Sequence, residues 1–108
     1  MLARRLDRLP RRRVCGREVP VAIGPQARLL GLAGLGPAQA GPGLLLPRCA
    51  SVHTFGMRFA LDLVFLDDAG SVLAVRRGVP ARRLAWRRGA DAVLELPAVG
   101  GEIAAGGP

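Results

Sequence analysis

The amino-acid sequence predicts a small, mainly β domain with a minor α component. We expect an antiparallel sheet that is curled or forms a partly open barrel, with one short helix. The chain has 108 residues, which is enough for one compact core and short for two domains. Half of the residues are hydrophobic, and in the longest apolar segment they recur with a period of two, which is typical of a strand. Strand-like segments follow one another without alternating helices, so a doubly wound parallel sheet is not expected.

The two ends of the chain differ from its middle. Residues 1–13 contain six arginines together with Pro10, and we expect a flexible, basic N-terminal arm. The single β-rich domain is expected over residues 14–103. Residues 104–108 end in two glycines and a proline and are expected to form a flexible tail.

The first half of the domain contains the expected helix. Residues 17–23 read as a short strand, and Pro20 favours an edge position because it lacks a backbone N–H. Residues 26–35 carry leucines at near-helical spacing, but their two glycines weaken the helix and predict that it is short. Residues 36–43 are rich in glycine and proline and are expected to form a loop.

The second half reads as successive strands. Residues 44–47 form a brief apolar run. Residues 53–66 are predicted to form one long strand, because nearly all odd positions are apolar and the even positions are mixed. Residues 67–70 supply a turn, residues 71–77 the returning strand of a hairpin, and residues 92–96 a last strand.

The long strand carries the candidate ligand-binding residues His53, Thr54, Arg58 and Asp62. A regular strand would turn His53 to the apolar face and Thr54, Arg58 and Asp62 to the other. A bulge at Gly56 would bring His53 and Asp62 to one side, as an acid/base pair requires. Two simpler interpretations remain: a structural histidine hydrogen-bonded at the edge of the core, and a weak Arg58–Asp62 ion pair.

The cysteines and the single histidine favour no metal site and no cofactor. Cys49 and His53 could share one side of a strand, but zinc needs three or four protein ligands, and no finger-like spacing occurs. Two cysteines in a chain of this composition indicate reduced thiols and a cytoplasmic protein. The N-terminal residues resemble no signal peptide, and no apolar run approaches the roughly 20 residues of a membrane span.

The net charge of +8 indicates an anionic partner. The segment RRLAWRR interleaves four arginines with the only tryptophan, and this pattern suits base stacking with phosphate contacts. The nucleic-acid candidates are Arg82, Arg83, Trp86, Arg87 and Arg88. The simpler interpretation, which we favour, is an exposed loop anchored by its tryptophan. The complete absence of lysine also indicates a GC-rich genome in which arginine is the default cation.

The segment from Cys49 to Asp67, CASVHTFGMRFALDLVFLD, resembles the characteristic block of the domain of unknown function 192 family, a set of small prokaryotic domains. The runs LLGLAGL, GLLL and VLELP are similar to other stretches of that family, so the resemblance covers roughly residues 14 to 100. It implies a compact β-rich domain with a short helix and no settled activity. Ala60 stands where the family usually has proline, and residues 99–103 depart from its usual C-terminal segment.

Three functions are therefore open. The leading hypothesis is a noncatalytic accessory module that binds a small anionic ligand or a protein segment near His53, Thr54 and Asp62. One alternative is an acid/base enzyme that uses His53 and Asp62. The second alternative is a nucleic-acid-binding protein that uses the basic arm together with residues 82–88.

Overall fold

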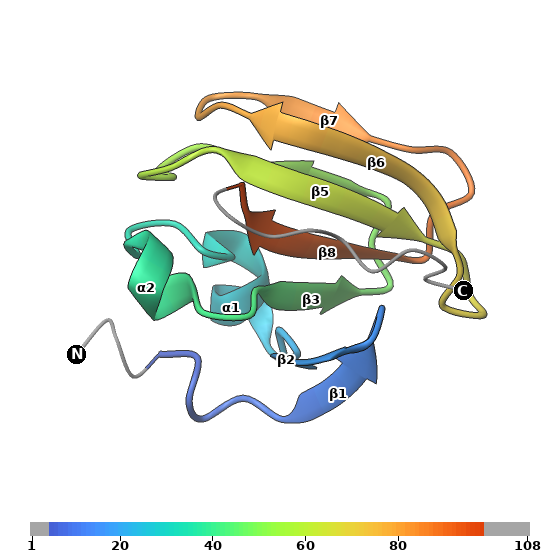
Figure 1. The fold of residues 1–108 in the computed structure, drawn as a ribbon, viewed down its shortest axis with the longest axis horizontal. Helices are drawn as coiled ribbons and strands as arrows, with labels where there is room; N and C mark the ends of the chain where they lie inside the picture. The colour runs from blue at the N-terminus through green and yellow to red at the C-terminus, as the bar shows by residue number, and fades with distance from the viewer. Residues whose placement is uncertain (1–4, 99–108) are drawn as a thin grey trace.

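A four-stranded antiparallel sheet forms the centre of the structure, a computed structural model that describes residues 5–98 (Figure 1). Its strands lie in the order β3 (Leu44–Pro47), β8 (Ala92–Pro97), β5 (Leu61–Leu66) and β6 (Val72–Val79). The last strand in the sequence therefore lies in the interior of the sheet, between β3 and β5. This order explains why its residues are apolar almost without interruption.

Two smaller antiparallel pairs flank the central sheet. Strands β1 (Arg11–Val14) and β2 (Arg17–Pro20) form one hairpin, seen at the bottom of Figure 1. Strands β4 (Ser51–His53) and β7 (Leu84–Trp86) form the other pair. Both β6 and β7 are drawn at the top of Figure 1, but β7 pairs with β4 and not with β6.

The central sheet buries apolar side chains on both faces. On one face, Leu61, Leu63 and Phe65 belong to the larger core, with residues of the helical region and of β4. On the other face, Val64 and Leu66 pack in a second core that includes Val19 of β2. The alternation along β5 therefore separates two cores, and this explains why Val64 and Leu66 are apolar although they face away from the larger core.

The prediction of a mainly β, antiparallel domain is confirmed, with one difference: the described residues contain two short helices rather than one. No sheet among them closes into a barrel. Helix α1 (Pro25–Leu30) ends earlier than expected because Gly31 turns the chain with φ 55° and ψ −127°. Helix α2 (Pro37–Ala40) is a single turn within the expected loop.

The prediction of one long strand over residues 53–66 is wrong. Strand β4 ends at His53, and β5 begins at Leu61. Between them Gly56 adopts a φ of +79°, and its carbonyl oxygen accepts a hydrogen bond from the Gly34 N–H at 3.0 Å. The chain thus leaves the sheet to contact the turn after α1, a tertiary interaction that the period of two does not reveal.

The predicted hairpin between β5 and β6 is confirmed. The Asp67 side chain accepts hydrogen bonds from the backbone N–H groups of Ala69 and Ser71 at 2.9 and 2.8 Å. Gly70 has a φ of +84°, the left-handed conformation that glycine adopts without a steric penalty. An aspartate at the first position and a glycine at the last therefore both favour this turn.

The basic segment before residue 14 contacts the domain in the part that is described. Leu6 is buried in the larger core, and Arg11–Val14 form β1. The Arg5 guanidinium donates hydrogen bonds to the carbonyl oxygens of Gly31 and Ala33 at 3.1 and 2.8 Å.

The expected tail at 104–108 and the expected domain end at 103 lie outside the described residues. No helix within residues 5–98 is long and apolar enough to cross a membrane.

Candidate ligand-binding site

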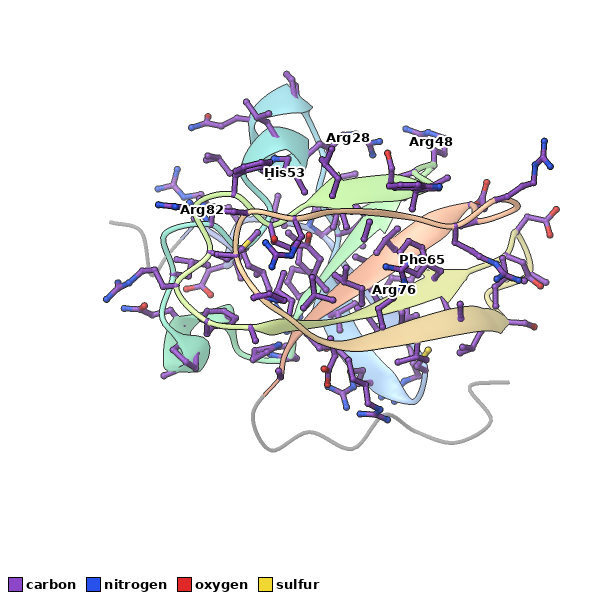
Figure 2. All side chains as sticks on the ribbon, turned by 90° about the horizontal axis from the view of Figure 1, so that it is seen from above. Arg28, Arg48, His53, Phe65, Arg76 and Arg82 are labelled. Carbon is purple, nitrogen blue, oxygen red and sulfur yellow. The ribbon has the colours of Figure 1, made fainter. Side chains whose placement is uncertain are left out.

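A cavity of about 260 Å³ lies between the end of α1, strand β4 and strand β8. Residues 28–31 form one wall, and Ser51, Val52 and His53 form another. Figure 2 shows Arg28 and His53 close together on one side of the molecule. One sequence-predicted residue, His53, therefore lines a concave site.

Glu95 forms the floor of this cavity and was not among the predicted site residues. It lies in β8 opposite Leu44 and Leu63, both of which belong to the larger core, and it is only 1% exposed. Its Oε1 atom has no hydrogen-bond partner among residues 5–98. A buried carboxyl oxygen without a partner is costly and marks a place where a ligand would be stabilising. The available signal was a single glutamate in an otherwise apolar strand.

Burial raises the pKa of Glu95 to about 8, against the opposing effect of a hydrogen bond from the Leu32 backbone N–H. The carboxyl group is therefore mostly protonated at neutral pH. A protonated carboxyl donates one hydrogen bond through its O–H group and accepts others. The cavity floor consequently presents an uncharged group that both donates and accepts.

His53 fixes the wall of the cavity through its two ring nitrogens. The Phe55 backbone N–H donates to Nδ1 at 3.2 Å, so Nε2 carries the proton and donates to the Leu29 carbonyl oxygen at 3.0 Å. This is the neutral tautomer, and it ties the end of β4 to the last turn of α1. Both nitrogens thus have backbone partners, and the ring is a positioning element of the wall.

Arg28 places a positive charge at the same cavity. Its guanidinium donates hydrogen bonds to the carbonyl oxygens of Pro47 and Arg48 at 2.6 and 3.3 Å. Within residues 5–98 no carboxylate oxygen lies within 4 Å of it, so its charge is not paired.

Cys49 also lines the cavity, and its thiol donates to the Ser51 carbonyl oxygen at 2.8 Å. Apart from Glu95, no acidic side chain lines this site.

Thr54 lies next to His53 in the sequence but has a different environment. Its fully buried hydroxyl donates to the Pro80 carbonyl oxygen at 2.7 Å and accepts from the Arg83 N–H at 2.8 Å. The side chain thus holds the connection between β6 and β7. It does not line the cavity.

Asp62 faces the opposite side of the central sheet. It lies opposite Leu96, a residue of the second core, and its Oδ1 accepts a hydrogen bond from the Gly78 N–H at 2.8 Å. Its Oδ2 is 3.6 Å from Nη1 of Arg77. The expectation of an Arg58–Asp62 ion pair is therefore wrong, because the bulge in the β5–β6 pairing brings Arg77 there instead. Arg58 is exposed and does not line the cavity.

The structure does not bring the four predicted ligand-binding residues together. It places His53 with Glu95 in one cavity, Thr54 beneath a loop, and Asp62 across the sheet. Part of the predicted nucleic-acid segment, Trp86–Arg88, borders a separate groove of about 490 Å³. Arg82 and Arg83 lie at the other end of that segment, beside Thr54.

The described residues contain no group of three or more His, Cys, Asp or Glu side chains that could hold a metal ion. Cys15 and Cys49 are both free thiols. Burial raises the pKa of the Cys15 thiol, and the nearby Arg17 partly opposes this effect.

Comparison with known proteins supports the resemblance noted in the sequence. The model of the DUF192 family, described as Uncharacterized ACR, matches residues 11–105. Among solved structures, the chain is similar to a protein of unknown function from Novosphingobium aromaticivorans, with a TM-score of 0.60 and 19% sequence identity. The similarity covers 74% of this chain and 62% of that one, less than two thirds of its length, and shows the fold alone. None of the curated proteins matches the chain.

Proposed function

The chain belongs to the DUF192 family of uncharacterised proteins, and from this premise we propose that it is a noncatalytic accessory module that binds a small anionic ligand in the cavity above Glu95. The unpartnered, buried Oε1 atom of Glu95 is the observation that carries the proposal. It is a polar group that a bound molecule would satisfy, in a cavity that is also lined by Arg28 and His53.

The charges around the cavity support an anion. Arg28 contributes a positive charge that no carboxylate neutralises within the described part of the chain. Glu95, whose pKa is raised to about 8, contributes an uncharged O–H donor at neutral pH. A carboxylate ligand would accept a hydrogen bond from Glu95 at the floor and face Arg28 at the wall.

The dimensions of the cavity support a small ligand. Its volume of about 260 Å³ lies just under the range of roughly 300–1,000 Å³ that is usual for drug-sized ligands. A small carboxylic acid, or the acidic end of a protein segment, would fit this space. Apolar walls from Leu30, Leu46 and Met57 would contact its carbon chain.

The acid/base alternative that uses His53 and Asp62 gains no support from this geometry. Both nitrogens of His53 already have backbone partners, and Asp62 faces the other side of the sheet. A catalytic acid and base must converge on one substrate position.

A cytoplasmic location also remains part of the proposal and is supported by the two free thiols.

A ligand screen tests the proposal. The full chain would be heated with small carboxylates, phosphates, amines and neutral amides at about pH 7, and each stabilising compound would be titrated by calorimetry. A ligand that binds only the folded protein raises the melting temperature by mass action. We expect carboxylates to stabilise the chain and amines to have no effect. No stabilisation by any anion, or stabilisation by amines instead, would contradict the proposal.

Two arginine variants test whether the charge at the cavity, rather than the overall charge of the chain, attracts the ligand. Arg28→Gln removes the charge at the cavity and should weaken carboxylate binding about tenfold, as expected for the loss of a charged hydrogen-bond donor. Arg12→Gln removes the same charge from β1, which contributes no lining residue, and should leave binding within about twofold. Equal losses in the two variants would show that overall charge, and not the cavity, attracts the ligand.

A further inference from the structure

The stretch from Ser71 to Ala90 carries a strong positive charge, of which, in the part of the chain that the structure describes, only Arg77 is paired with a carboxylate, that of Asp62. It contains six arginines and no acidic residue, although the whole chain has eight acids and a net charge of +8. These residues form β6, its connection to β7, and β7 itself. We call residues 71–90 the basic ribbon. Its arginines Arg76, Arg82, Arg83, Arg87 and Arg88 make no ion pair with a carboxylate among residues 5–98.

A groove of about 490 Å³ runs along this ribbon. Arg76 of β6 lies on one side of it, and Trp86, Arg87 and Arg88 lie on the other. The buried ring of Phe65 forms its floor; Figure 2 shows Phe65 next to Arg76 and apart from His53. The groove shares no lining residue with the cavity above Glu95, so it is an independent site.

Trp86 makes this groove different from a simple basic patch. The side chain is 65% exposed, although tryptophan is normally buried to a large extent. Its backbone is fixed, because β7 pairs with β4 and Trp86 lies opposite Ser51. Trp86 thus lines the groove together with Arg87 and Arg88, and its indole ring has no aromatic partner among the described residues.

We propose that the basic ribbon binds single-stranded nucleic acid, with one base stacked on Trp86 and the adjoining phosphates held by Arg76, Arg87 and Arg88. An exposed aromatic ring beside a positively charged groove is the combination that such proteins use for unpaired bases. Duplex DNA is less suitable, because its bases are already stacked and a groove of this volume has room for about one nucleotide. A membrane surface would also attract arginines, but it would not need a groove.

Because Trp86 is the only tryptophan of the chain, its fluorescence reports directly on base stacking at this residue. Oligonucleotides of about ten nucleotides, dT and rU, would be titrated into the full chain while Trp86 fluorescence and the anisotropy of a labelled oligonucleotide are recorded. We expect quenching of Trp86, and binding that weakens as salt rises from about 50 to about 200 mM. Three arginine–phosphate contacts predict a slope of about −2 in a plot of log K against log salt.

Matched variants separate the ribbon from the overall charge. Arg87→Gln/Arg88→Gln should weaken binding at least tenfold and flatten the salt slope by about 1.4, because each lost phosphate contact removes about 0.7. Arg12→Gln/Arg13→Gln removes two adjacent, exposed arginines from β1 and should change the affinity less than threefold. Trp86→Leu should weaken binding about tenfold while keeping the salt slope, because stacking is lost and charge is kept.

Several results would overturn the proposal. One is a failure of the oligonucleotides to bind at low salt, and another is binding without a change in Trp86 fluorescence. Equal losses of affinity in the two double-arginine variants would also contradict the proposal. Equal affinity for heparin or polyphosphate would show that the ribbon is only a general polyanion site. Binding to vesicles of phosphatidylglycerol and phosphatidylcholine with no binding to oligonucleotides would identify a membrane surface instead.

Discussion

Oε1 of Glu95 lies 2.8 Å from the position that a Cβ atom would occupy on Gly31. The carboxyl group of the buried strand β8 can therefore reach the turn after α1 only because residue 31 has no side chain. The same glycine has φ 55° and ψ −127°, a conformation that other residues rarely adopt. Gly31 thus ends the helix and makes room for the floor of the proposed ligand site.

Gly31→Ala should consequently destabilise the protein by about 2 kcal/mol or more, from backbone strain and from the clash with Glu95. Urea unfolding of the full chain measures this change. Gly34→Ala is the matched control, because Gly34 also has a positive φ of 81° but has no atom within 4 Å of its Cβ position. Gly34→Ala should therefore cost about 1 kcal/mol, the strain alone. Equal costs for both variants would show that the approach of Glu95 to Gly31 has no energetic effect.

The stability of the protein should fall as pH rises through neutrality. Burial raises the pKa of Glu95 to about 8, whereas the unfolded chain has the ordinary value near 4.3. Between these values the folded state binds more protons than the unfolded state, so each pH unit lowers the free energy of unfolding by about 1.4 kcal/mol. Below the lower value and above the higher one, this contribution is constant.

Glu95→Gln isolates this effect, because the amide has a similar shape and does not titrate. The pH dependence of its stability should be flatter than that of the wild-type protein between about pH 5 and pH 8, and it should be the more stable of the two near pH 9. Chemical unfolding at each pH provides the measurement. Parallel pH profiles for the two proteins would show that Glu95 is ionised when folded.

The histidine that ties β4 to α1 should affect local more than global stability. His53→Ala removes the hydrogen bonds to Leu29 and Phe55, and a typical hydrogen bond contributes about 1 kcal/mol. We expect faster amide hydrogen exchange in α1 and in the turn that follows it, with little change in β5 and β8. Uniformly faster exchange throughout the sheet would contradict a local role for His53.

The Thr54 hydroxyl should stabilise the connection between β6 and β7. Thr54→Val keeps the volume but leaves the Pro80 carbonyl and the Arg83 N–H without this partner, so we expect a loss of about 2 kcal/mol in urea unfolding. Thr54→Ser keeps the hydroxyl and loses only a buried methyl group, which costs about 1 kcal/mol. A larger loss for serine than for valine would indicate that Thr54 acts through packing alone.

Local chemistry explains which parts of the structure could be predicted from the sequence. The hairpin at Asp67–Gly70 depends on its own residues, and the apolar runs of β3 and β8 are long enough to identify buried strands. The break after His53 depends on a contact between Gly56 and Gly34, which are distant in the sequence. The approach of Glu95 to Gly31 likewise joins two elements that are distant in the sequence, so neither feature follows from periodicity.

The site was only partly predictable from the sequence, because it also depends on contacts between residues that are distant in the chain. His53 is a candidate in the sequence because it begins the predicted long strand, and it does line the cavity. Asp62 was grouped with it on the assumption of a bulge at Gly56, but the sheet separates the two residues. Glu95 was missed because its role depends on burial between β3 and β5, which only the strand order reveals.

The central claim is that a protonated Glu95 at the floor of the cavity binds a small anion. The pH dependence of carboxylate binding, measured by calorimetry on the full chain from about pH 6 to pH 10, tests it most directly. The account predicts constant affinity below about pH 8 and a tenfold loss for each pH unit above it, because the ionised carboxylate would repel the ligand. Glu95→Gln should bind the same ligand with no such loss. An affinity that stays constant through pH 10 in the wild-type protein, or falls equally in both proteins, would contradict the account.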